Sequence, residues 1–84
     1  MNPSTDGFTS FKELDSRWAA NKGSAFRAFK RALPGLQEGR DFLRLDAVAD
    51  REAIQRLRSA GRIYSGSVHV VLLSDSGLQK LTRP

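Results

Sequence analysis

Three cationic side chains with helical spacing are the residues of this 84-residue chain whose arrangement most clearly suggests a chemistry. Arg27, Lys30 and Arg31 stand at positions i, i+3 and i+4, which places them together on one face of a helix. No Asp or Glu stands four residues before or after any of them to neutralise the charge. Such a group can contact the phosphates or the base edges of a nucleic acid. A solvated helix face without a partner is the other interpretation of the same residues.

Positive charge is also segregated along the chain. The formal net charge is +5, yet residues 16–37 contain five cations and no acid, and residues 53–74 contain three cations and no acid. The remainder holds six cations and all nine acids. A phosphate-binding surface requires such segregation, whereas a surface that only confers solubility mixes the two signs. The distribution therefore favours an anionic partner.

Residues able to perform catalysis or to hold a metal are few. The chain has no Cys, which excludes disulfides, thiolate metal ligands and cysteine nucleophiles. His69 is the single histidine and lies in a predicted strand with no second functional group beside it. Capping and surface roles suffice for Asp41, Asp46 and Asp50. We therefore expect no enzyme activity, no cofactor, no metal and no small-molecule substrate.

Length and composition indicate one small domain. A chain of this size with 39% hydrophobic and 27% charged residues can fold but has no room for a second domain. No apolar run approaches the roughly 20 residues that span a bilayer, and the first ten residues do not resemble a secretory signal. We expect a cytoplasmic protein without a membrane partner, with residues 1–9 as a flexible lead-in and residues 10–84 as the domain.

Two short helices joined by a tight turn position the cations. Ser10 and Glu13 form a capping-box pattern, which predicts a first helix over residues 11–20. Its shared apolar face consists of Phe11, Leu14 and Trp18. Gly23 is expected to adopt the left-handed conformation that closes this helix, and Ser24 to cap the next one.

The second helix is predicted over residues 25–33 and ends at Pro34-Gly35. Its spacing directs Phe26, Phe29 and Leu33 to one side and the three cations to another. We interpret the two phenylalanines as core residues. Two helices around a short turn that contains glycine match the helix-turn-helix pattern.

The second half of the chain predicts a strand, a helix, a hairpin and a last helix. Alternation over residues 40–45 indicates a strand, and Asp46 or Asp50 can cap a helix that ends at Gly61. The inward residues of that helix are Ile54 and Leu57. Residues 62–73 are β-branched and aromatic on both sides of Ser65-Gly66-Ser67, which predicts a β-hairpin. Ser74 can cap the last helix, which carries Leu78 and Leu81.

This order predicts an α+β fold, a small winged helix-turn-helix domain with a β-hairpin wing. In such domains a helix enters the major groove and the hairpin contacts the flanking backbone, and the two acid-free stretches fall on those two parts. The helix that reads DNA usually stands directly before the wing, so the role of residues 48–60 stays open. The predicted DNA-contacting residues are Lys22, Ser24, Arg27, Lys30, Arg31, Arg62, Tyr64, Ser65 and Ser67.

Two stretches carry a family resemblance. Glu38-Gly39-Arg40-Asp41-Phe42 and Val71-Leu72-Leu73-Ser74-Asp75-Ser76-Gly77-Leu78 resemble the N-terminal DNA-binding domains of phage regulatory and antirepressor proteins, the KilA-N-like group. The resemblance spans about residues 11–81. It implies a phage or prophage transcriptional regulator that binds double-stranded DNA, sequence-specifically or semi-specifically, through its basic helix. It leaves open whether the domain represses, activates or antagonises another regulator.

Other partners are compatible with the same residues. A small phage-encoded module that docks on an acidic surface of a host enzyme and inhibits it would use Trp18 and Tyr64 as interface residues. RNA binding is less favoured, because no aromatic pair lies on a predicted strand. A homodimer could form through Leu78 and Leu81 of the last helix.

Overall fold

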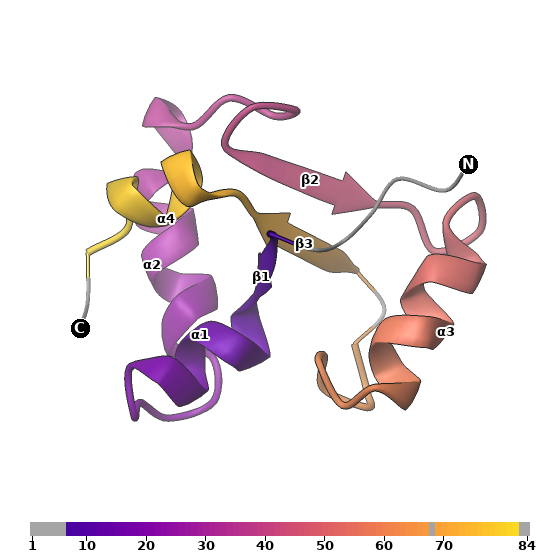
Figure 1. Ribbon diagram of the computed structural model, residues 1–84. Coiled ribbons are helices and arrows are strands. Elements are labelled where there is room, and N and C mark those ends of the chain that lie inside the picture. The colour runs from indigo at the N-terminus through magenta and orange to yellow at the C-terminus, as the bar shows by residue number, and fades with distance from the viewer. Residues whose placement is uncertain (1–6, 68, 83–84) are drawn as a thin grey trace.

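The computed structural model describes residues 7–67 and 69–82, which fold into a small α+β domain (Figure 1). A three-residue 3-10 helix, Leu33–Gly35, follows directly after the second α-helix. The strands and α-helices, in chain order, are β1 (Thr9–Ser10), α1 (Phe11–Arg17), α2 (Ser24–Ala32), β2 (Phe42–Leu45), α3 (Arg51–Ser59), β3 (Val70–Leu73) and α4 (Asp75–Lys80).

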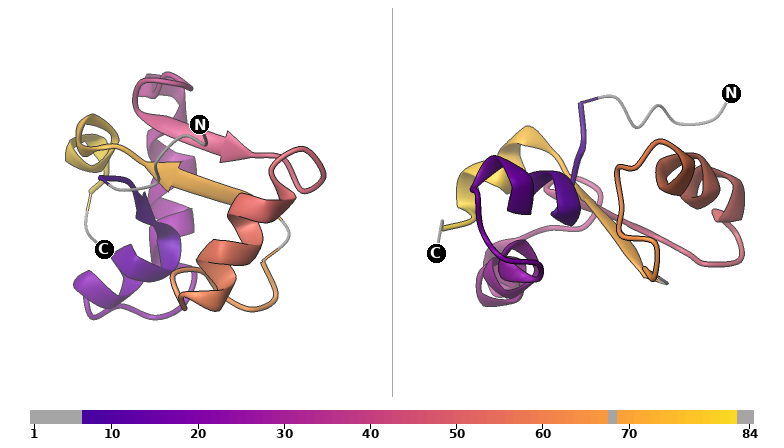
Figure 2. Two further views of the ribbon diagram at one scale, coloured as in Figure 1. Left: turned by 45° about the vertical axis from the view of Figure 1, so that its right-hand side comes forward. Right: turned by 90° about the horizontal axis from the view of Figure 1, so that it is seen from below.

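The sheet has three antiparallel strands in the order β1-β3-β2. All four residues of the central strand β3 are buried, because helices cover both faces of the sheet. Val71 and Leu73 pack with residues of α1 and α2, whereas Val70 and Leu72 pack with Ile54 and Leu57 of α3. Figure 2 shows α1, α2 and α4 on one side of the sheet and α3 on the other. The continuous apolar run of β3 is therefore that of a strand with two buried faces.

The predicted hairpin over residues 62–73 is wrong in its first half. Only Val70–Leu73 forms a strand, and it pairs with β1 and β2, whereas residues 62–67 contain no strand. Ile63 is buried in the cluster under α3, and the side chains of Arg62 and Tyr64 form hydrogen bonds to α1. The apolar and aromatic residues of this segment serve burial and cross-links between elements, and they form no wing.

The turn between α1 and α2 differs in detail from the expectation. The capping box at Ser10 and Glu13 is confirmed, but α1 ends at Arg17, and Ala19 takes the left-handed conformation with φ 52°. Gly23 adopts the predicted left-handed conformation, with φ 94°, but it stands directly before α2 and does not close α1. Ser24 is already helical and does not cap α2. The turn thus contains two left-handed residues, of which only one is glycine.

The buried side of α2 is lined mainly by small residues. Ala25, Ala28 and Phe29 are buried, with 0%, 2% and 3% of their surface exposed, whereas Phe26 is 47% exposed. The assignment of Phe26 to the core is therefore wrong, while that of Phe29 is confirmed. Because alanine side chains are small, α2 packs closely against α1 and the sheet through Ala25 and Ala28. In this orientation Phe26 lies at the edge of the buried side.

The two phenylalanines of α2 give a matched test of this packing. Phe29→Ala is expected to lower the free energy of unfolding by about 3–5 kcal/mol, because it empties a site in the core. Phe26→Ala is expected to cost less than about 1 kcal/mol, since its ring is half in water. Urea unfolding of both variants measures the difference, and equal losses would contradict the orientation of α2.

The predictions for α3 and α4 are confirmed in part. α3 begins after Asp50 and buries Ile54 and Leu57 as expected, but neither aspartate caps it through its side chain. The Asp46 carboxylate accepts hydrogen bonds from Val48 and Ala49 in the preceding turn, and the Asp50 carboxylate accepts one from the Asp46 amide at 2.7 Å. The cap of α4 at Ser74 is confirmed.

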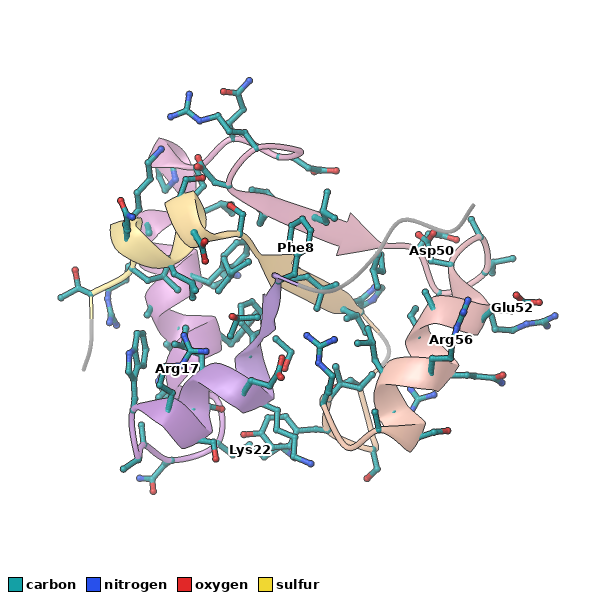
Figure 3. All side chains as sticks on the ribbon, in the orientation of Figure 1. Phe8, Arg17, Lys22, Asp50, Glu52 and Arg56 are labelled. Carbon is teal, nitrogen blue, oxygen red and sulfur yellow. The ribbon has the colours of Figure 1, made fainter. Side chains whose placement is uncertain are left out.

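The ends of the described chain are more ordered, or more buried, than expected. Thr9 was placed in the flexible lead-in, yet it lies in β1 and is 7% exposed; residues 1–6 lie outside the described residues. Phe8, labelled in Figure 3, packs against the cluster on the α3 side. Leu81 is 8% exposed and Leu78 packs against the same core cluster, so they do not present the predicted dimer seam. Among the described residues, none of the helices has the length and apolar character needed to cross a bilayer.

The two stretches that carry the family resemblance lie against each other. The carboxylate of Asp41, whose side chain is fully buried, accepts hydrogen bonds from the Ser76 hydroxyl at 2.7 Å, the Gln37 amide at 2.9 Å and the Lys80 ammonium at 3.0 Å. These three donors, in that order, lower the pKa of Asp41 from its ordinary value to about 2. The Ser74 amide donates to the Asp41 carbonyl at 3.0 Å. Asp41 is thus no surface residue, and both stretches serve to join α4 to the start of β2.

Candidate functional site

The exposed side of α2 carries three cations. Arg27, Lys30 and Arg31 are all exposed, whereas the opposite side of the helix is buried. Within residues 7–67 and 69–82, none of the three lies within salt-bridge distance of a carboxylate. The Lys30 ammonium lies 5.6 Å from the centre of the Phe26 ring, and the Arg27 guanidinium is 3.4 Å from the Ser24 hydroxyl. We call Arg27, Lys30 and Arg31 the α2 cationic face.

A buried carboxylate on α1 holds this helix in place. Asp15 is 2% exposed, and its carboxylate accepts hydrogen bonds from the backbone amides of Gly23 at 3.0 Å and Ala25 at 2.7 Å. These amides belong to the start of α2, which has no cap from its own side chains. A negative charge at a helix N-terminus also interacts favourably with the helix dipole. Asp15 therefore fixes the angle at which α2 leaves the turn.

Tyr64 is the third partner of Asp15. Its hydroxyl donates to the carboxylate at 2.7 Å, which joins the segment 62–67 to the α1 and α2 pair. Desolvation, and then the hydrogen bond and the charge of Asp15, raise the pKa of Tyr64 to about 12. The ammonium groups of Lys22 and Lys12 lie 4.8 Å and 5.8 Å from the centre of its ring.

Because Tyr64 is the only tyrosine, its titration can be followed by tyrosinate absorbance alone. We expect a midpoint near pH 12 in the folded protein and near the ordinary value of about 10 in urea. Since the pKa is higher in the folded state, the stabilisation is complete below about pH 10 and is lost as the pH rises through 12. A midpoint near 10 in the protein while it is still folded would show that the bond to Asp15 is absent.

Arg62 lies apart from the α2 cationic face. Its guanidinium donates to both carboxylate oxygens of Glu13, at 3.1 Å and 3.0 Å, and to the Phe8 carbonyl at 2.8 Å. The Ser10 hydroxyl donates to the Arg62 carbonyl. Although burial opposes it, the Arg62 hydrogen bond and the Ser10 amide hold the pKa of Glu13 below its ordinary value. Arg62 thus connects distant parts of the chain, and its charge is compensated.

The remaining predicted residues fall into different surroundings. Ser24 is 6% exposed and does not reach the surface. Ser65 is exposed in the turn, and the carbonyl of Ser67 accepts a hydrogen bond from Arg58 at 2.6 Å. Three of the predicted residues, Lys22, Tyr64 and Ser67, line a groove beside α2.

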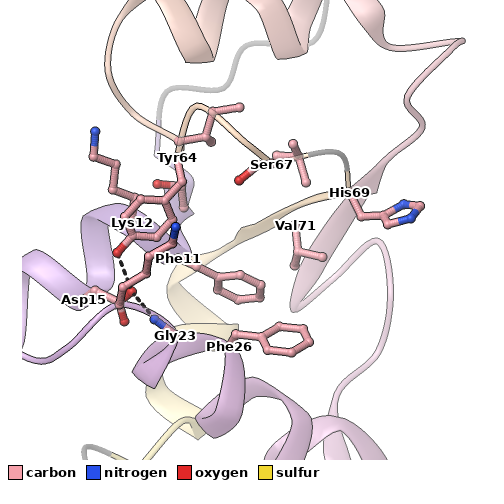
Figure 4. Close-up of a pocket in the computed structure, with 13 residues that line it drawn as sticks. Phe11, Lys12, Asp15, Gly23, Phe26, Tyr64, Ser67, His69 and Val71 are labelled. Atoms are coloured by element: carbon pink, nitrogen blue, oxygen red, sulfur yellow. Dashed lines mark hydrogen bonds between the residues drawn. The ribbon is translucent and has the colours of Figure 1, made fainter.

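This groove has a volume of about 240 Å³ and lies between α1, the start of α2, the segment 62–67 and β3. The surface that lines it is mainly apolar, although polar and charged residues also contribute to it (Figure 4). Phe11 and Phe26 meet edge to face there, with ring centres 5.8 Å apart. Figure 4 shows the two rings with Val71, and with Lys12 and Tyr64 on one side of them and His69 on the other. We use the word groove for this feature and for the residues that line it.

The described residues contain no group of three or more His, Asp or Glu that could hold a metal ion. His69 is exposed and stands one residue before β3 instead of within a strand. Comparisons with models of protein families, with curated proteins and with solved structures found no match to this chain.

Sequence reasoning missed both the role of Asp15 and the groove. In the helix predicted over residues 11–20, Asp15 stands in the middle, so nothing local marks it. Only the observed end of α1 at Arg17 places it in the last turn, where an acidic residue is unfavourable for the helix dipole. The groove has no local signal, because its walls come from segments that are far apart in the sequence.

Proposed function

We propose that the chain binds double-stranded DNA, with α1 and α2 as a helix-turn-helix pair and the α2 cationic face against the duplex. The observation that carries this proposal is the exposure of Arg27, Lys30 and Arg31 on one side of a nine-residue helix with no acidic partner among the described residues. A helix of this kind fits the major groove, where Arg and Lys contact phosphates and guanine edges.

Two further features support the proposal. The Asp15 hydrogen bonds hold α2 at a fixed angle, and a rigid helix loses little entropy when it binds. Lys22 is exposed just before the helix and is the next candidate for a phosphate contact. The resemblance to KilA-N-like domains extends the proposal to a phage or prophage regulator. The proposal does not include Ser24, Arg62 or a hairpin wing.

Selection of bound fragments from random duplex DNA at about 150 mM salt tests the proposal. We expect enrichment of a short motif, because side chains on one helix reach only a few base pairs. Arg27→Ala and Arg31→Ala are each expected to weaken binding to that motif by about 1–3 kcal/mol if they contact bases. Equal weakening on every sequence would assign them to phosphates. Retention of no duplex at all would refute DNA binding.

A further inference from the structure

The groove lies where the edge of β3 is not covered by β1. Strand β1 pairs only with Leu72 and Leu73, through Ser10 and Thr9, after which the chain turns into α1. The rest of β3, Val70 and Val71, lines the groove together with Phe11. A sheet edge that extends beyond its neighbour is a place where an extended segment of another chain can lie.

The charge around the groove is positive. Lys12 and Lys22 are among its residues, and Lys30 of the α2 cationic face is next to Phe26. Among the described residues, Asp15 is the only acidic one that lines it, and its buried carboxylate already accepts three hydrogen bonds. An apolar occupant that carries negative charge beside it is therefore complementary to the groove, and a cationic one is not.

The size and the openness of the groove favour one inserted side chain over a whole small ligand. Pockets that enclose small ligands usually have volumes of roughly 300–1,000 Å³. The groove, with about 240 Å³, is smaller than that. Phe26 is 47% exposed at its rim, and exposed aromatic rings of this kind are typical of protein interfaces.

We propose that the groove docks an extended acidic segment of a partner protein, which inserts one aromatic or large aliphatic side chain between Phe11, Phe26 and Tyr64. Carboxylates on either side of that residue lie near Lys12 and Lys22. The groove adjoins the α2 cationic face where Lys30 lies over Phe26, but Arg27, Lys30 and Arg31 are not among the residues that line it. The inference therefore does not depend on DNA binding.

Selection from a library of random peptides on the full chain tests this inference. The library is first depleted on the Phe26→Ser variant, in which the groove loses one wall. We expect the enriched peptides to combine Asp or Glu with one Phe, Trp, Leu, Ile or Met. One enriched peptide is then synthesised and its affinity measured by fluorescence anisotropy.

Variants separate the groove from the rest of the surface. Phe26→Ser is expected to weaken the peptide at least about tenfold, and Lys12→Gln by about two- to fivefold. Arg56→Gln, an exposed cation on α3, is the matched control and is expected to leave the affinity unchanged. Melting curves establish that each variant is folded; since Phe26 and Arg56 are exposed, we expect all three to be.

Several outcomes would overturn the inference. The first is that no peptide is enriched on the wild type over the Phe26→Ser variant, and the second is that the enriched peptides lack acidic residues. The third is that Lys12→Gln and Arg56→Gln change the peptide affinity equally. Titrations with benzoate and with a single-stranded oligonucleotide form two further arms. If benzoate or the oligonucleotide perturbs the NMR signals of Phe11 and Tyr64 while no peptide is selected, the groove binds that class of ligand. The peptide proposal is then wrong.

Discussion

Gly77→Ala is expected to unfold the domain or to lower its free energy of unfolding by more than about 3 kcal/mol. A Cβ atom at this position would lie 2.0 Å from the carbonyl oxygen of Asp41 and 2.9 Å from its carbonyl carbon. Both atoms belong to the backbone, so no rotation of a side chain relieves the contact. The cost is large against the total stability of roughly 5–10 kcal/mol that is usual for a domain of this size.

A second glycine provides the control. At Gly35 a Cβ atom would meet nothing within 4 Å and the backbone is not left-handed, so Gly35→Ala is expected to change stability by less than about 1 kcal/mol. Thermal and urea unfolding, followed by circular dichroism, compare the two variants. A Gly77→Ala protein that unfolds like the wild type would contradict the close contact between α4 and the start of β2.

Reversal of all three charges on the α2 cationic face is expected to weaken binding to duplex DNA at least about hundredfold. Each change of Arg27, Lys30 or Arg31 to Glu replaces a positive charge by a negative one, so the net charge falls from +5 to −1. The three side chains are exposed and have no acidic partner among the described residues, so the fold is expected to persist.

The same change of net charge on another surface is the matched control. Arg44, Arg51 and Arg56 are exposed on β2 and α3, so none of them belongs to α2, and their reversal to Glu also lowers the net charge by six units. Fluorescence anisotropy with a labelled duplex measures both variants at equal salt. If the two triple variants lose affinity to the same extent, net charge and not the α2 cationic face controls binding.

Local signals in the sequence predicted the elements but not how they pack. The capping box at Ser10 and the cap at Ser74 were correct, because each depends on residues within three positions of it. The caps predicted for the two helices between them were wrong, since α2 and α3 have no side-chain cap. The strand Phe42–Leu45 and the inward residues of α3 were correct for the same reason, since periodicity is a local property.

The errors concern contacts between distant residues. Tyr64 and Arg62 bond to residues 49 positions earlier, so their segment was mistaken for half of a hairpin. The spacing of Phe26, Phe29 and Leu33 predicted a buried face centred on the large residues, whereas the buried side of α2 consists of Ala25, Ala28 and Phe29 and leaves Phe26 half exposed. The candidate site was predicted in part: the α2 cationic face was expected as such, while the groove needed the fold.

The salt dependence of the affinity for duplex DNA tests the central claim most directly. If the three cations of α2, with or without Lys22, replace counterions on phosphates, the plot of log K against log salt has a slope between about −2.5 and −4. Each single alanine variant on the α2 cationic face is then expected to reduce the magnitude of that slope by about 1. A slope near zero, or a slope that Arg27→Ala, Lys30→Ala and Arg31→Ala all leave unchanged, would contradict the claim.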